Sequence, residues 1–266
     1  ALTAEVTGDF LNTVGQIDDA ALIRAGDTKG GVIESTDDME IVAATVTNDE
    51  NAEISASGAM EMAANRGNLE NHGYIWSRGE LNATTSADFV NTKNIVSADS
   101  INVTAADNAY VTNGYIAAAK DITMDAQSGD VQITQNSVIN SGGKATIDAA
   151  GKIDVNSSKI HGDESLAMNA KGGVLNVLAH SALTAGGAFD GVGSVDLVSK
   201  TGNVHIHDST VMADDYAKID AAGYAHVLNS EVRSLDGGMN INTVGDTFIE
   251  NSQVSTTGDM NINAGK

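Results

Sequence analysis

Three histidines are spaced so that their side chains could meet on one surface. His205 and His226 are 21 residues apart, and His207 follows His205 by two positions. In a chain that repeats with a period near 21 residues, His205 and His226 point outward about 5 Å apart in adjacent repeats, beside Asp208. Imidazoles and carboxylates are ligands that Zn²⁺ and Ni²⁺ accept. The spacing fixes no third ligand, so we expect a polar surface and no metal or cofactor.

Paired carboxylates are the second source of chemistry. Polysaccharide lyases and hydrolases use clustered carboxylates as acid and base, or carboxylates that hold Ca²⁺ beside an Arg or Lys. Adjacent pairs occur at Asp18–Asp19, Asp37–Asp38 and Asp214–Asp215, and near the last pair only Arg233 lies at an aligned position. We therefore expect solvated carboxylates at corners of the fold and no catalytic residues.

Four residues are suited to binding. Tyr74 and Tyr115 each precede an apolar residue of a core-facing series, and Trp76 and Val96 each follow one. The neighbours of an inward residue in a strand face outward. We expect these four side chains, continued by Val138, to form an exposed apolar surface of the kind that marks partner sites. Tyr and Trp also stack on sugars; corner packing and contact between shafts are the alternatives.

The composition excludes several classes of partner. The 266 residues include 14 basic and 36 acidic side chains, a formal net charge of −22. Affinity for a phosphate backbone or an anionic membrane surface comes from Lys and Arg, so we expect no nucleic-acid partner and no membrane insertion. The chain contains no Cys and no Pro. The absence of Pro is typical of a chain made of hydrogen-bonded strands.

A repeat of about 22 residues runs through the chain and positions all of these side chains. A motif of the form apolar, polar, apolar recurs, and from residue 41 to residue 262 it advances by 221 residues in ten steps. The second apolar position of the motif falls at Ile41, Met62, Ala83, Val103, Met124, Ile147, Met168, Leu197, Ile219, Ile241 and Ile262. Alternation of apolar and polar residues is the period of a strand with one buried face.

Two further apolar series keep the same phase. The second series is Leu69, Val90, Val111, Ile133, Val155, Val177, Ile206, Val227 and Ile249. The third is Ile54, Ile75, Ile95, Ile116, Ile139, Ile160, Leu183, Val211, Val232 and Val254. Three short strands per repeat that return to the same lateral position must stack in parallel.

The repeat therefore predicts an all-β fold, a right-handed parallel β-helix with three faces and about 22 residues per turn. Residues 1–40 should form less regular first turns of the same solenoid, and residues 41–266 the regular β-helix. One step of the first series is 29 residues long, from Met168 to Leu197. This step predicts a glycine-rich loop insertion near 185–191.

The repeat resembles a known family. The runs Gly58–Ala63, Gly67–Ile75 and Gly79–Ala83 alternate Gly, Leu or Ile, Asn and Ala in the manner of the haemagglutinin repeat of filamentous haemagglutinin-like exoproteins. The resemblance covers roughly residues 41 to 266. It implies a secreted or surface-displayed bacterial protein of a two-partner secretion system, exported through an outer-membrane partner protein, in which these repeats form the β-helical shaft.

This resemblance and the residues together predict a non-enzymatic segment of an adhesin with a role in virulence. The segment is a rod that presents a binding surface to a receptor or glycan on a host or neighbouring cell. The family also includes contact-dependent growth-inhibition effectors, so a receptor-binding or delivery stalk is one alternative. A polysaccharide-active β-helix lyase or hydrolase is another. The proline-free chain lacks the Asn-Pro motifs of the family's secretion domain, so the resemblance is to the shaft alone.

Overall fold

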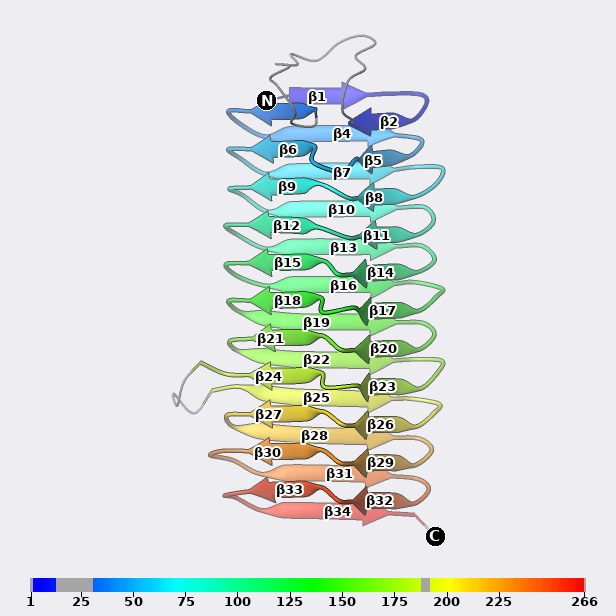
Figure 1. The fold of residues 1–266 in the computed structure, drawn as a ribbon, viewed down its shortest axis with the longest axis vertical. Helices are drawn as coiled ribbons and strands as arrows, with labels where there is room; N and C mark the ends of the chain where they lie inside the picture. Colours follow the sequence, from blue (N-terminus) through cyan, green and yellow to red (C-terminus); the bar gives the residue numbers. More distant parts are fainter. Residues whose placement is uncertain (1, 13–30, 188–191, 266) are drawn as a thin grey trace.

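The computed structural model describes residues 2–12, 31–187 and 192–265, which form three parallel β-sheets wound into a solenoid (Figure 1). The sheets, named A, B and C here, contain 12, 11 and 11 strands. About ten turns of about 22 residues stack along one axis. The prediction of an all-β, right-handed parallel β-helix with three faces is confirmed.

The strands of sheet A are β1 (Leu2–Glu5), β4 (Met39–Ala43), β7 (Met60–Ala64), β10 (Leu81–Thr85), β13 (Ile101–Ala105), β16 (Ile122–Ala126), β19 (Lys144–Ala149), β22 (Ser165–Ala170), β25 (Ser194–Ser199), β28 (Tyr216–Ala221), β31 (Met239–Thr243) and β34 (Met260–Ala264). Those of sheet B are β2 (Phe10–Asn12), β5 (Val46–Asn48), β8 (Leu69–Asn71), β11 (Phe89–Asn91), β14 (Ala109–Thr112), β17 (Val131–Thr134), β20 (Ile153–Asn156), β23 (Leu175–Leu178), β26 (Val204–His207), β29 (Ala225–Leu228) and β32 (Thr247–Glu250). Those of sheet C are β3 (Val32–Ser35), β6 (Glu53–Ala56), β9 (Tyr74–Ser77), β12 (Asn94–Ser97), β15 (Tyr115–Ala118), β18 (Val138–Ser141), β21 (Lys159–Gly162), β24 (Ala182–Ala185), β27 (Thr210–Ala213), β30 (Glu231–Ser234) and β33 (Gln253–Thr256).

The register of two sheets follows the apolar series in the sequence. In sheet A each member of the first series pairs with the next, as in Ile147 with Met124 and Met168. In sheet C the third series pairs in the same way, as in Ile95 with Ile75 and Ile116. Except in the last turn, where Ile262 is exposed and Val254 partly buried, these inward residues are buried and form one continuous core. Each turn therefore packs its apolar residues on those of the turn before it.

The second series is wrong at its first two positions. Leu69 pairs with Phe89, and Val90 pairs with Tyr110 on the outer face. The position that pairs with Val111 in the preceding turn is Asn91, which is fully buried. A one-residue slip moves a side chain to the other face of a strand. The prediction chose Val90 because the residue that occupies the core position in this turn, Asn91, is polar.

Buried asparagines form a ladder at the corner between sheets B and C. Nδ2 of Asn12 donates to Oδ1 of Asn48 at 2.9 Å, Asn48 to Asn71 at 2.8 Å, and Asn71 to Asn91 at 2.8 Å. Backbone carbonyls receive further bonds, such as that from Asn71 to Gly73 at 3.1 Å. A Cβ on Gly73 would lie 2.8 Å from the amide nitrogen of Asn48, so glycine leaves room for the ladder.

Buried serines take over this corner in later turns. Oγ of Ser230 accepts from the backbone N–H of Ser209 at 3.1 Å, and Oγ of Ser252 accepts from that of Ser230 at 3.0 Å. Each hydroxyl also donates to a carbonyl, as Ser230 does to Leu228 at 2.7 Å. Both residue types therefore satisfy backbone groups that the bend would otherwise leave buried without partners.

The predicted insertion near 185–191 lies partly outside the described residues. The connection between β24 and β25 begins at Gly186 and ends at Gly193, with φ angles of 107° and 149°, a region that favours glycine. Within residues 1–40, the described strands β1, β2 and β3 each join one of the three sheets. No helix in the described ranges has the length and apolar character that a bilayer crossing requires.

Candidate functional site

The four predicted binding residues lie on the outer face of sheet C. Tyr74 and Trp76 on β9 are 48% and 40% exposed, and Tyr115 on β15 is 39% exposed. Val96 on β12 is partly buried between them. They face outward because Ile75, and its equivalents in the neighbouring turns, face the core. We call Tyr74, Trp76, Val96 and Tyr115 the aromatic patch.

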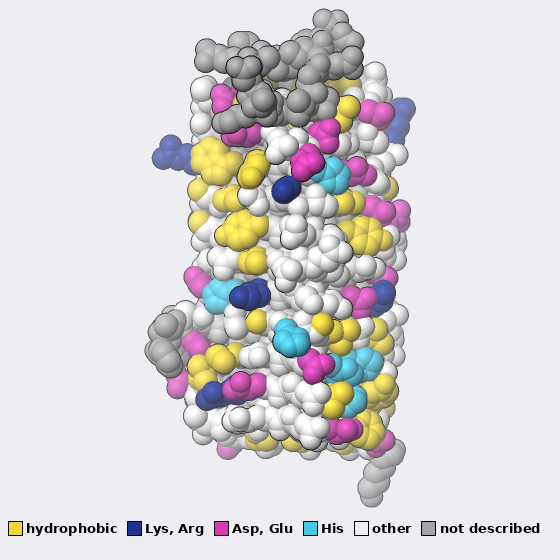
Figure 2. Space-filling view, viewed as in Figure 1, with side chains coloured by type: hydrophobic (Ala, Val, Ile, Leu, Met, Phe, Trp, Pro, Cys, Tyr) yellow, Lys and Arg dark blue, Asp and Glu magenta, His cyan; other side chains and the backbone are white. Residues whose placement is uncertain are grey.

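The register brings the members of the aromatic patch onto two columns. Tyr74, Asn94 and Tyr115 occupy equivalent positions in three successive turns, and Trp76 lies beside Val96. Equivalent positions in adjacent turns are about 4.8 Å apart, so the two tyrosines are about 10 Å apart along the axis. Figure 2 shows apolar side chains, in yellow, over the left side of the rod at the height of β9 to β15.

A groove follows the corner between sheets B and C beside this patch. Its volume is about 430 Å³. We call it the corner groove; among the described residues, its lining consists of Asp49, Glu50, His72, Thr92, Lys93, Thr112, Asn113 and Gln135. Nδ1 of His72 lies 2.8 Å from Oγ1 of Thr92, and Nε2 lies 3.6 Å from a carboxylate oxygen of Glu70. Carboxylate, imidazole, hydroxyl, amide and ammonium groups therefore line the groove in successive turns.

The corner groove was not predicted from the sequence. Its lining residues recur at steps of 20 to 22 residues, as at His72, Thr92, Asn113 and Gln135, and all are polar. This polar column runs in phase with the apolar series and could have located the corner. The hollow itself depends on the angle between two sheets, which the pattern does not contain.

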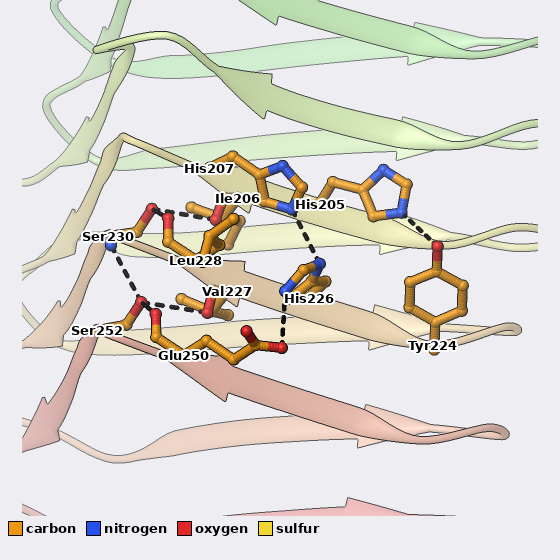
Figure 3. Close-up of polar contacts among 10 residues, drawn as sticks. All are labelled: His205, Ile206, His207, Tyr224, His226, Val227, Leu228, Ser230, Glu250 and Ser252. Atoms are coloured by element: carbon orange, nitrogen blue, oxygen red, sulfur yellow. Dashed lines mark hydrogen bonds and ion pairs between the residues drawn. The ribbon is translucent and has the colours of Figure 1, made fainter.

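The three predicted metal-site histidines form a second cluster, on the outer face of sheet B near the C-terminal end. His205 and His207 on β26 and His226 on β29 lie close together with Tyr224 (Figure 3). The ring of Phe248 packs against those of Tyr224 and His226. We call these five residues the histidine cluster. Ring centroids are 5.5 Å apart for His205 and His207 and 4.6 Å apart for His207 and His226.

The contacts within the histidine cluster differ from the predicted pairing. His205 and His226 are register partners as expected. The hydrogen-bonded pair, however, is diagonal: Nε2 of His207 lies 3.2 Å from Nδ1 of His226. His205 instead contacts Tyr224 Oη at 3.1 Å and Asn176 Oδ1 at 2.8 Å. Side-chain rotation at the outer face allowed this exchange, which backbone register alone does not determine.

Burial and mutual repulsion act on the charge state of the cluster. Burial lowers the pKa of His205, and the nearby His207 and His226 lower it further. Burial and His226 likewise lower the pKa of His207, against the opposing effect of Asp208. The carboxylate of Glu250 lies 3.4 Å from Nε2 of His226. The cluster therefore favours neutral imidazoles at its centre.

The geometry for a metal is incomplete. Within the ranges that the structure describes, no group of three or more His, Asp or Glu side chains is arranged to hold a metal ion. Asp208, the acidic neighbour considered from the sequence, is exposed, and its Oδ1 accepts a hydrogen bond from Asn229 at 3.1 Å. Of the proposed ligands, the imidazoles of His207 and His226 are the pair within hydrogen-bonding distance of each other.

One carboxylate pair differs from the expectation. Asp37 and Asp38 are exposed, and Asp18–Asp19 lies outside the described residues. Asp214, predicted to be solvated, is only 7% exposed, and its Oδ2 has no hydrogen-bond partner among the described residues. The cause is the insertion: a Cβ on Gly186 would lie 2.6 Å from Cγ of Asp214. Arg233 pairs with Glu231 at 3.2 Å.

The structure thus places the aromatic patch and the corner groove side by side on the outside of the same turns, and the histidine cluster farther along the rod. Charged groups of both signs gather in the corner groove, whose lining includes Asp49, Glu50, His72 and Lys93. Comparison with known proteins gives no match to a protein family, to a curated protein or to a solved structure.

Proposed function

We propose that this chain is a structural and adhesive shaft segment of a secreted or surface-displayed bacterial filamentous haemagglutinin-like adhesin. The observation that carries the proposal is the uninterrupted stack of about ten turns in three parallel sheets. Ten steps of about 4.8 Å give a rod roughly 48 Å long. Such a rod holds whatever lies on its sides or beyond its end away from a cell.

The mechanics of the rod follow from its ladders. Each strand is hydrogen-bonded to the equivalent strand in the turn before and the turn after, so bending the rod would stretch a column of bonds in at least one sheet. The buried asparagine ladder adds side-chain bonds along the same axis. These features support a load-carrying role that needs no moving part.

The adhesive part of the proposal rests on the aromatic patch. Tyr74, Trp76 and Tyr115 are exposed although their side chains carry large apolar surfaces. Contiguous exposed apolar patches often mark sites that bind a partner or ligand. The partner we propose is a receptor or glycan on a host or neighbouring cell, and the resemblance described above implies export through an outer-membrane partner protein.

A non-enzymatic role is also part of the proposal. Several carboxylates of sheet A are held by lysines between turns: Lys171 lies 3.6 Å from both Asp125 and Asp148. Lys218 similarly lies 3.4 Å from Asp196 of the preceding turn, and 2.8 Å from Asp220 of its own strand. We infer that these carboxylates stabilise the outer face of sheet A through ion pairs and do not act as a general acid and base.

Two measurements test the proposal. Small-angle scattering should give an elongated particle, and labelled protein should bind to cells in a manner weakened by Trp76→Ala and Tyr115→Ala but not by Tyr224→Ala. Scattering from a near-spherical particle, or cell binding that none of these variants changes, would contradict it. Incubation with polygalacturonate and glycosaminoglycans should release no reducing ends or unsaturated products; product formation would instead favour a polysaccharide-active enzyme.

A further inference from the structure

The corner groove extends over several turns of the rod. Its lining comes from the corners that follow β5, β8, β11, β14 and β17, with Glu50, His72, Thr92, Asn113 and Gln135 at successive levels. Four steps of about 4.8 Å make this column roughly 19 Å long. The groove therefore runs parallel to the rod axis and fits an extended chain better than a compact ligand.

The groove offers hydrogen-bond donors and acceptors along its length. Thr92 and Thr112 carry hydroxyls, Asn113 and Gln135 carry amides that both donate and accept, and Lys93 donates. Asn113 and Gln135 are exposed at the corner, with φ angles of 52° and 59°. Sugar hydroxyls also donate and accept, so a chain of sugars can satisfy such a lining where an apolar peptide would not.

The aromatic patch begins one residue beyond the groove lining along the chain. Only Gly73 separates His72 from Tyr74, and only Gly114 separates Asn113 from Tyr115. Each tyrosine is therefore the first residue of the strand that leaves the groove, two positions after a lining residue, and its side chain is exposed. Polar groups for hydroxyls beside an aromatic face for C–H groups match the two sides of a sugar ring.

The charge of the molecule restricts which sugars fit. The net charge is −22, and among the described lining residues Asp49 and Glu50 are acidic and Lys93 is basic. Sulfated or uronate-rich glycans would approach a surface of like charge and would be repelled, most strongly at low salt. Neutral sugars pay no such cost.

We propose that the corner groove and the aromatic patch together bind one neutral polysaccharide chain that lies along the rod axis. This assignment rests on the proposed adhesive function and names its ligand class. Tyr74 and Tyr115 stack on sugar rings about two turns apart, and the groove residues bind the hydroxyls of the same chain. Trp76 lies within the patch, so the bound chain changes the environment of its indole ring and hence its fluorescence.

Trp76 provides the test, because it is the one Trp in the sequence. Its fluorescence is titrated with neutral six-sugar oligosaccharides, namely cello-, manno- and galacto-series, and with heparin and polygalacturonate oligosaccharides of the same length; calorimetry runs in parallel. We expect a saturable change with at least one neutral series and at least tenfold weaker binding of the anionic ones. Absence of binding to every neutral series, or tighter binding of an anionic one, overturns the proposal.

Variants locate the site. Tyr115→Ala removes a stacking ring, and Thr112→Val removes a groove hydroxyl at nearly constant volume; each should weaken neutral-glycan binding at least tenfold. Tyr224→Ala removes an exposed tyrosine just before β29, in the histidine cluster, and should leave neutral-glycan binding unchanged, with β-sheet circular dichroism confirming that all variants fold. Equal affinity across the variants overturns the proposal. If labelled rods still bind cells while no neutral glycan binds, only this assignment fails; a near-spherical particle defeats the proposed function itself.

Discussion

The hydrogen bond between His207 and His226 exists only when one of the two facing nitrogens lacks a proton. In the unfolded chain both imidazoles take up protons near the ordinary histidine pKa of about 6.5. In the folded chain the pKa values of His205 and His207 are lowered by burial and by their neighbours. Protonation therefore favours the unfolded state.

Stability should fall as the pH drops below about 6.5, and the loss is complete only below the depressed pKa values of the folded state. Urea denaturation followed by circular dichroism between pH 8 and pH 5 measures it. His207→Gln should flatten the dependence, because one of the two lowered groups is gone. His180→Gln, which removes an exposed histidine outside the cluster, should retain the slope of the parent. Identical slopes for both variants would argue against the cluster as the cause.

The asparagine ladder gives a prediction about a single buried amide. Asn71→Ala leaves the amide of Asn48 and the carbonyl oxygen of Asn91 without their side-chain partners in a site closed to water. We expect a loss of about 2 to 4 kcal/mol in unfolding free energy. The matched control is Asn82→Ala, which removes an outward amide that accepts from Asn102 at 2.9 Å and should cost about 0.5 kcal/mol or less. Equal urea midpoints for the two variants would contradict the ladder's importance.

At the level of the strands and corners, the turns bend between sheets B and C through residues with left-handed backbone angles. Asn51, Asn113, Asn229 and Asn251 have positive φ, as suits asparagine. Ala179 has a φ of 55°, where the Cβ costs about 1 to 2 kcal/mol relative to glycine. The corner after β23 therefore stores strain that the corners with asparagine lack.

Ala179→Gly should raise the unfolding free energy by about 1 kcal/mol, because the strain removed exceeds the extra chain entropy that glycine loses on folding. Thermal and urea unfolding measure the gain. Ala182→Gly, three residues later in β24, has ordinary strand geometry and should lower stability by about 0.5 to 1 kcal/mol. The explanation fails if both substitutions change stability in the same direction.

The strands and most of their register were predictable because a buried apolar residue recurs at the same lateral position in every turn. Ile41 through Ile262 shows this in sheet A. The prediction failed at Val90, where Asn91 fills the core position through hydrogen bonds to other amides. A hydrophobic pattern has no means of recognising a polar residue that is buried by virtue of its partners.

The candidate sites were predictable only as far as backbone direction goes. Alternation correctly placed Tyr74, Trp76 and Tyr115 on the outside. The diagonal contact between His207 and His226 depends on side-chain rotamers, and the burial of Asp214 depends on how the insertion crosses it. Both are determined by packing between segments and are absent from any spacing along the chain.

Across the whole molecule, stability comes from contacts between adjacent turns. Each strand in the interior of a sheet pairs with one strand before it and one after it, about 22 residues away in sequence. A rod of this kind behaves as a one-dimensional array, in which damage to one turn is felt mainly by its neighbours. A domain with a single round core would instead share the damage throughout.

Ile147→Ala tests this at the middle of the rod. Ile147 is fully buried on β19 between Met124 and Met168, and its truncation should cost about 3 kcal/mol. By hydrogen exchange with mass spectrometry, we expect exchange to accelerate roughly a hundredfold in β16, β19 and β22, while β7 and β31 keep the protection of the parent. Asp148→Asn, on the outer face of the same strand, should leave every segment within about 0.5 kcal/mol. Uniform acceleration from β4 to β31 in the Ile147 variant would mean that the turns open together, as one cooperative unit.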